Sequence, residues 1–169
     1  NYYYYGSYNS FVNQYGQSLS TFGLDTSKPL KDQTCALLES GTWEDYFRQS
    51  AETTIRTTYA LADTAAKEGY QLTEDDKSYI ERNVKSIQDS AAEQKVTAEQ
   101  IVENYYGPGG NMEVFRAQMD RETLASSYKQ YLVDNYNFSD DEIDASYISN
   151  KASIDQVTYH SLLISTESK

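Results

Sequence analysis

Four short segments of this chain carry the pattern of a helix start, and they constrain the fold more than any other feature. In each segment a Thr or Ser precedes an Asp, Glu or Gln by three positions. The hydroxyl can accept from the third backbone N–H of the helix, and the acid or amide can accept from the first residue's own N–H. Proline, which breaks helices, occurs only twice in the 169 residues. The pattern predicts an all-α fold with helix starts at Thr42–Asp45, Thr73–Asp76, Thr97–Gln100 and Ser139–Glu142.

Apolar residues between these starts recur every three to four positions, as they do on one face of a helix. Trp43, Phe47 and Ile55, for example, share one face of the second expected helix. Gly69 predicts its end, and the Gly107-Pro-Gly-Gly110 segment predicts a firm break further on. We therefore expect five to six helices, at about residues 3–22, 42–68, 73–94, 97–106, 111–136 and 139–149. An irregular connection to about residue 33 and a short helical turn at 33–40 complete the expectation.

The tail differs from the rest of the chain. Residues 157–164, Val-Thr-Tyr-His-Ser-Leu-Leu-Ile, are rich in β-branched and apolar types, which predicts a short β-strand. A single strand leaves its backbone groups unpaired, so it needs further strands from its own domain or from another chain. We expect a helical domain at 1–150 and the start of a second domain at 151–169, and leave homodimerisation through the strand open.

Charge and composition exclude several classes of function. The chain has 26 acidic and 14 basic residues, a net charge of -12, which argues against nucleic acid as a partner. One cysteine, Cys35, and one histidine, His160, argue against a zinc site or a nucleophile–base pair, and we expect no cofactor, metal or catalytic residue. No apolar run reaches the ~20 residues of a membrane span. Because the sequence starts at Asn1 and not Met, we expect a targeting segment to have been removed, with a membrane anchor upstream of Asn1 left open.

The remaining candidate for function is an apolar surface on the helices. Methionine and aromatic side chains adapt to partners of varied shape, and a groove between helices can accept an extended or helical segment. The alternative interpretation is that the same residues form an ordinary core. The candidates for peptide binding are Phe47, Tyr59, Met112, Phe115, Met119, Tyr128 and Tyr131.

The order of these elements resembles the helical chaperone domain of the SurA/PrsA family of extracytoplasmic foldases, which is similar to that of trigger factor. The matching features are the helix start at 72–76, the Tyr-Tyr-Gly break at 105–107, the long helix 111–136, the Ser139 start with Tyr147, and the strand that follows. The resemblance implies a SurA/trigger-factor-like peptide-binding domain. It also implies an extracytoplasmic location, and clients that are unfolded or nascent secreted proteins, bound without chemistry.

Many members of this family also carry a parvulin-type peptidyl-prolyl isomerase domain, and the tail departs from its pattern. The family places a catalytic His directly before an Ile-Leu-Val-like triplet. Here 162–164 matches the triplet, so Ser161 occupies that position and His160 would point to the opposite face of the strand. We do not expect this chain to isomerise proline. Two alternatives stay open: a fragment of an isomerase whose catalytic domain lies beyond Lys169, or a surface module that uses its Tyr-rich N-terminus for adhesion.

Overall fold

The structure, a computed structural model, describes residues 1–156 and forms two compact units, which divide after Val133. The regular elements in the described residues are α-helices and 3₁₀-helices. A single antiparallel bridge joins Thr34 to Thr42. The predicted all-α class is thereby confirmed, while the predicted strand at 157–164 lies outside the described residues. The division after Val133 falls earlier than the expected boundary at 150, because the last helix belongs to the second unit.

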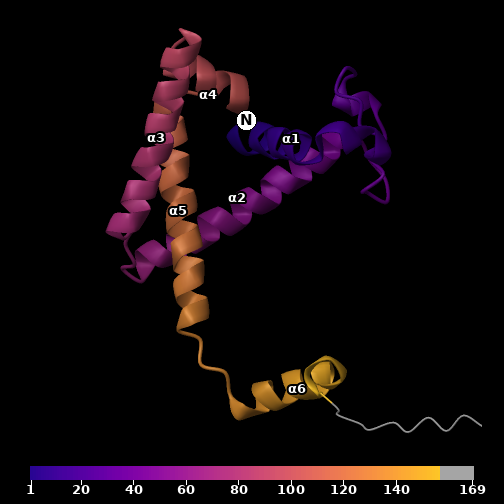
Figure 1. Ribbon diagram of the computed structural model, residues 1–169, viewed down its shortest axis with the longest axis vertical. Helices are drawn as coiled ribbons and strands as arrows, with labels where there is room; N and C mark the ends of the chain where they lie inside the picture. Colours follow the sequence, from indigo (N-terminus) through magenta and orange to yellow (C-terminus); the bar gives the residue numbers. More distant parts are fainter. Residues whose placement is uncertain (157–169) are drawn as a thin grey trace, which may run out of the picture. The chain divides into compact units, whose positions relative to one another are not determined.

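The first unit contains five α-helices (Figure 1). Within the described residues, no helix combines the length and the apolar character that a bilayer crossing requires. The α-helices are α1 (Tyr2–Tyr15), α2 (Trp43–Lys67), α3 (Glu74–Gln94), α4 (Ala98–Tyr106) and α5 (Met112–Asp134), and two 3₁₀ segments, Gly16–Phe22 and Leu30–Asp32, lie between α1 and α2.

All four predicted helix starts carry the expected reciprocal caps. At α2, the Asp45 N–H donates to Thr42 Oγ1 at 3.2 Å and the Thr42 N–H donates to Asp45 Oδ2 at 2.9 Å. The start of α5 is capped by Asn111, whose Oδ1 accepts from the Val114 N–H at 2.9 Å. The sequence thus predicted the helix starts from local hydrogen bonding alone.

Three expectations about the ends and connections differ from the structure. The first helix ends at Tyr15, not near residue 22, because Gly16 adopts a positive φ of 40° and a 3₁₀ segment follows. Residues 33–40 hold turns and the bridge at Thr34 in place of a helical turn. The last helix continues to Ile154, five residues past the expected end at 149.

Two buried clusters form the interior of the first unit, and α1 touches both. One contains Phe11, Leu24, Cys35, Trp43 and Phe47, with Tyr4 and Tyr8 packed against it. The other contains Ile80, Val102, Phe115 and Met119, from α3, α4 and α5, with Tyr2 packed against it. The N-terminal tyrosine run therefore lies where the two clusters approach each other.

Helices α3 and α5 lie side by side and run antiparallel in the first unit (Figure 1). Arg116 near the start of α5 pairs with Glu81 of α3. Further along α5, the Ser127 hydroxyl bonds Asp76 Oδ1, at the start of α3, at 2.6 Å. This arrangement presents the other side of α5 to α1 and α2, where the candidate site lies.

The second unit contains one described helix, α6 (Asp140–Ile154). Ser139 caps its N-terminus, and the Ser139 Oγ accepts a hydrogen bond from the Glu142 N–H at 3.3 Å. The Glu142 carboxylate accepts a second hydrogen bond, from the Tyr136 hydroxyl, at 2.6 Å. Large apolar side chains on and before the helix are exposed, among them Phe138 at 65% and Ile148 at 73%.

Candidate functional site

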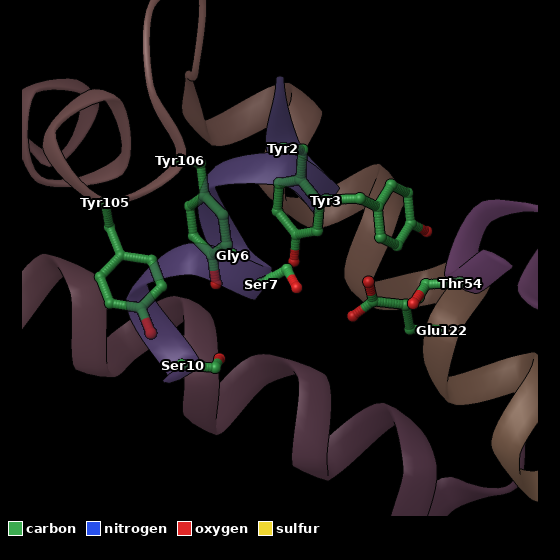
Figure 2. A pocket seen from close by; sticks show the side chains of 9 residues that line it. All are labelled: Tyr2, Tyr3, Gly6, Ser7, Ser10, Thr54, Tyr105, Tyr106 and Glu122. Carbon is green, nitrogen blue, oxygen red and sulfur yellow. The ribbon is translucent and has the colours of Figure 1, made fainter. Parts of the chain in front are cut away.

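Two hollows lie at α1, one on either side of a wall made by Tyr2, Tyr3 and Tyr106. The first, here called the Glu122 pocket, has a volume of about 300 Å³ and is shown in Figure 2. The second, called the apolar hollow, has a volume of about 370 Å³. Besides the wall, the Glu122 pocket is lined by Gly6, Ser7, Ser10, Thr54, Tyr105 and Glu122. The apolar hollow is lined by Asn1, Tyr4, Ala51, Ile55, Tyr59, Pro108, Gly109, Gly110, Val114 and Gln118.

Ring packing makes the wall. The Tyr2 and Tyr106 rings are stacked, with centroids 4.1 Å apart and planes 10° apart, and they lie side by side in Figure 2. Tyr3 meets Tyr2 edge to face at a centroid distance of 5.2 Å. Such pairs contribute about 0.5–1.5 kcal/mol beyond the burial of their area. The wall is therefore held by side chains from α1 and α4, which lie about a hundred residues apart in sequence.

The end of α4 is fastened to α1 by polar contacts as well. The Asn1 side-chain amide donates to the Pro108 carbonyl at 2.8 Å, and the Asn9 side-chain amide donates to the Tyr105 carbonyl. Gly107 ends α4 with a φ of 83°, and the Tyr5 ring covers it so closely that a Cβ atom there would overlap the ring. The close approach of α1 to this turn places Tyr2 against Tyr106.

A hydrogen-bond network fixes the far side of the apolar hollow. Arg121 Nη1 donates to the Tyr59 hydroxyl and to Gln118 Oε1, both at 3.0 Å, and its guanidinium lies 4.2 Å from the Tyr59 ring centroid. The Tyr3 hydroxyl donates to the same Gln118 oxygen at 3.1 Å. Ile55, on the α2 side of the hollow, keeps 38% of its surface exposed. The hollow therefore combines fixed aromatic walls with a solvent-exposed aliphatic side chain.

Glu122 of α5 is the only acidic residue that lines the Glu122 pocket. Figure 2 shows its carboxylate directed toward the tyrosines. Burial raises the pKa of Glu122, and the nearby Tyr3 hydroxyl opposes that increase to a smaller extent. Burial also raises the pKa of the Tyr2 and Tyr3 hydroxyls, and the negative charge of Glu122 raises both further.

No basic residue among 1–156 forms an ion pair with Glu122. The neighbouring Arg121 is held by Tyr59 and Gln118 on the other side of the wall. The pocket thus contains a half-buried carboxylate whose charge is not balanced by a cation from the described chain.

We expect the substitution Glu122→Gln to stabilise the fold at neutral pH. Because the folded state holds the Glu122 proton to a higher pH than the unfolded state, stability falls as pH rises from the ordinary glutamate pKa of 4.5 through the raised value. Glutamine does not ionise and avoids this loss. Thermal unfolding at a series of pH values should show a higher Tm for the variant at pH 7 and a difference that vanishes in acid.

The control for this prediction is Glu113→Gln, which removes one exposed negative charge from the same helix. It reports the general benefit of lowering the charge of an acidic chain, less the stabilisation that an acidic residue gains in the first turn of a helix. Equal pH profiles for the two variants would contradict the assignment of Glu122 as a desolvated carboxylate.

The structure separates the seven predicted peptide-binding residues into three groups. Phe47, Phe115, Met119 and Tyr128 are buried, between 0% and 8% exposed, and pack as core. Met112 is half-buried against the cluster of α3, α4 and α5. Two residues reach solvent: Tyr59 lines the apolar hollow, and Tyr131, 45% exposed, contacts Tyr70 at a ring distance of 5.2 Å. The structure thus brings only Tyr59 of the seven to a hollow at α1.

Sequence reasoning did not select Tyr2, Tyr3, Tyr106 or Glu122 for this site. The run of tyrosines at 2–5 was a visible signal, because four adjacent phenols at the start of a helix must face several directions and so touch several neighbours. Nothing in the sequence around Glu122 indicated its role, because the residues that surround it in space come from other helices. Within the described residues, no group of three or more His, Cys, Asp or Glu side chains is placed to hold a metal ion.

Comparison with family models, with curated proteins and with solved structures finds no match for this chain. The resemblance to SurA/PrsA foldases therefore stays a prediction from the sequence.

Proposed function

We propose that this chain is a polypeptide-binding domain that holds unfolded segments of secreted proteins, without covalent chemistry. The observation that carries this proposal is the apolar hollow: an open space of about 370 Å³ with tyrosine walls, beside which the Ile55 side chain stays exposed. Ligand pockets have volumes of about 300–1,000 Å³ and are mostly apolar with a few polar groups. The hollow fits one or two client side chains.

Two further features support a role in holding polypeptides. Arg121, Gln118 and Tyr59 are fixed by mutual contacts, so little side-chain entropy is lost when a client packs on them. Tyrosine also offers apolar area and a hydroxyl for backbone carbonyls, which suits partners of varied sequence.

A titration with a permanently unfolded polypeptide, followed by amide chemical shifts, tests the proposal. We expect shifts to cluster around the apolar hollow. The substitution Ile55→Asp should weaken binding by about tenfold or more, because an isoleucine contact is worth ~1.5–3 kcal/mol and a charge there would need to be desolvated.

The matched control is Leu37→Asp. Leu37 is an aliphatic residue of comparable exposure, 46%, but does not line either hollow. Equal losses from the two substitutions, or shifts spread evenly over the chain, would count against the hollow. Absence of any shift at high client concentration would overturn the proposal.

A further inference from the structure

The Glu122 pocket has the chemistry of a receptor for an organic cation. Four tyrosines, Tyr2, Tyr3, Tyr105 and Tyr106, line it together with a single carboxylate, and no Lys, Arg or His lines the space. The face of an aromatic ring attracts a cation that lies within about 6 Å of its centroid. A cation in this pocket would meet aromatic rings together with a carboxyl group whose ionised form the cation would favour.

The carboxylate of Glu122 differs from other glutamates of the first unit. Glu81 is paired with Arg116, and Glu44 lies 2.5 Å from an Arg48 nitrogen. Glu122 is half-buried, as Glu44 is, but it forms no ion pair with the described chain. Placing a carboxylate out of water without a cation is costly, so a bound cation would remove an existing penalty as well as add an attraction.

Three hydroxyl groups that line the same pocket can accept the remaining N–H groups of such a cation. Ser7 and Ser10 come from α1 and Thr54 from α2 (Figure 2). The Thr54 hydroxyl donates its hydrogen to the Ser50 carbonyl at 3.0 Å, which leaves its oxygen as an acceptor. A guanidinium has five N–H donors in one plane and an ammonium has three, so both benefit from several acceptors around one space.

The two hollows share the wall of Tyr2, Tyr3 and Tyr106, so one chain segment can reach both. The net charge of -12 would also speed the approach of a basic partner. We propose that the Glu122 pocket binds an organic cation, the guanidinium or ammonium group of an Arg or Lys side chain, on the polypeptide held at the apolar hollow. This inference rests on the proposed polypeptide-binding function and names the clients as segments with a basic residue near an apolar one.

The test is a titration of the intact chain with blocked peptides that differ in one side chain. One peptide carries arginine beside isoleucine. The second replaces arginine by citrulline, which has nearly the same shape and no charge. We expect the arginine peptide to bind about tenfold more tightly, the gain expected for a charge-assisted hydrogen bond, and to shift the amides around Glu122.

The substitution Glu122→Gln should abolish the preference for arginine over citrulline, while Glu113→Gln, its exposed control on the same helix, should preserve it. Equal affinity for the two peptides in the unsubstituted chain would overturn the proposal without reference to any variant. So would a preference that survives Glu122→Gln. Free ethylguanidinium that binds as tightly as the arginine peptide would overturn the assignment to a client side chain and indicate a small-cation site.

A blocked peptide that carries isoleucine and no charge separates this inference from the proposed function. If that peptide binds and the arginine peptide binds no more tightly than the citrulline peptide, the cation pocket is overturned and the proposed function is not. An arginine preference that depends on Glu122, with no binding of the isoleucine peptide, would sustain the cation pocket and overturn the apolar hollow as a client site.

Discussion

The substitution Phe47→Ala is expected to lower the free energy of unfolding by about 3–5 kcal/mol, the range for truncating a buried phenylalanine. Phe47 is fully buried, and its ring contacts Trp43 at a centroid distance of 5.7 Å and Tyr8 at 5.4 Å. Domains of this size have a total stability of only ~5–15 kcal/mol. Urea denaturation followed by circular dichroism should therefore show a large shift of the midpoint with little change of slope.

Phe47 was also a predicted peptide-binding residue, so this substitution decides between two roles. Ile55→Ala serves as the control on the same helix, because Ile55 is 38% exposed and its truncation should cost less than about 1 kcal/mol. A Phe47→Ala variant that keeps its stability and loses affinity for unfolded polypeptide would show that Phe47 belongs to the binding surface. A large loss of stability assigns it to the core.

The substitution Gly107→Ala is expected to cost at least about 2 kcal/mol and to separate α1 from the end of α4. The backbone of Gly107, with φ 83° and ψ -179°, lies in a region nearly closed to other residues, which costs ~1–3 kcal/mol. The added Cβ would also overlap the Tyr5 ring. Because Tyr5 follows Tyr2 and Tyr3 of the wall closely in α1, the Tyr2–Tyr106 stack should loosen, and binding at both hollows should weaken together.

Gly109→Ala is the matched control, since Gly109 has a similar φ of 85° but no atom within 4 Å of the position a Cβ would take. The difference in unfolding free energy between the two variants contains the clash and any difference in strain that arises from ψ, and the coupling to Tyr5 isolates the clash. A double-mutant cycle with Tyr5→Ala should recover part of the cost of Gly107→Ala. Equal costs for both glycines, with no coupling to Tyr5, would show that backbone strain alone accounts for the effect.

The helix starts were predictable because each depends on residues three positions apart. The caps at Thr42, Thr73, Thr97 and Ser139 were confirmed, and Gly69 lies just after the end of α2 with a φ of 74°. The end of the first helix was not predicted, because its apolar residues continue beyond Tyr15 through the 3₁₀ segment and hide the change of backbone. Periodicity reports which residues are apolar, and a 3₁₀ segment can bury them as an α-helix does.

Candidate site residues were harder to predict, because burial depends on the partner of each helix face. Phe47 and Phe115 looked equally suited to a groove or a core, and contacts from other helices place both in the core. Tyr59 carried the same ambiguity, yet it remains at an open hollow, where Arg121 fixes its position. The aromatic type of a residue was known from the sequence, and its accessibility was not.

By itself, the sequence determined the all-α class, the starts of the helices and the acidic charge, since these follow from local hydrogen bonding, side-chain periodicity and composition. The tertiary structure alone decided that α1 touches both buried clusters and that Tyr2 stacks on Tyr106. It also decided that Glu122 lines a pocket with four tyrosines and forms no ion pair with the described chain. The physical reason is distance along the chain: these contacts join residues up to about 120 positions apart, and no local pattern encodes which helix faces meet.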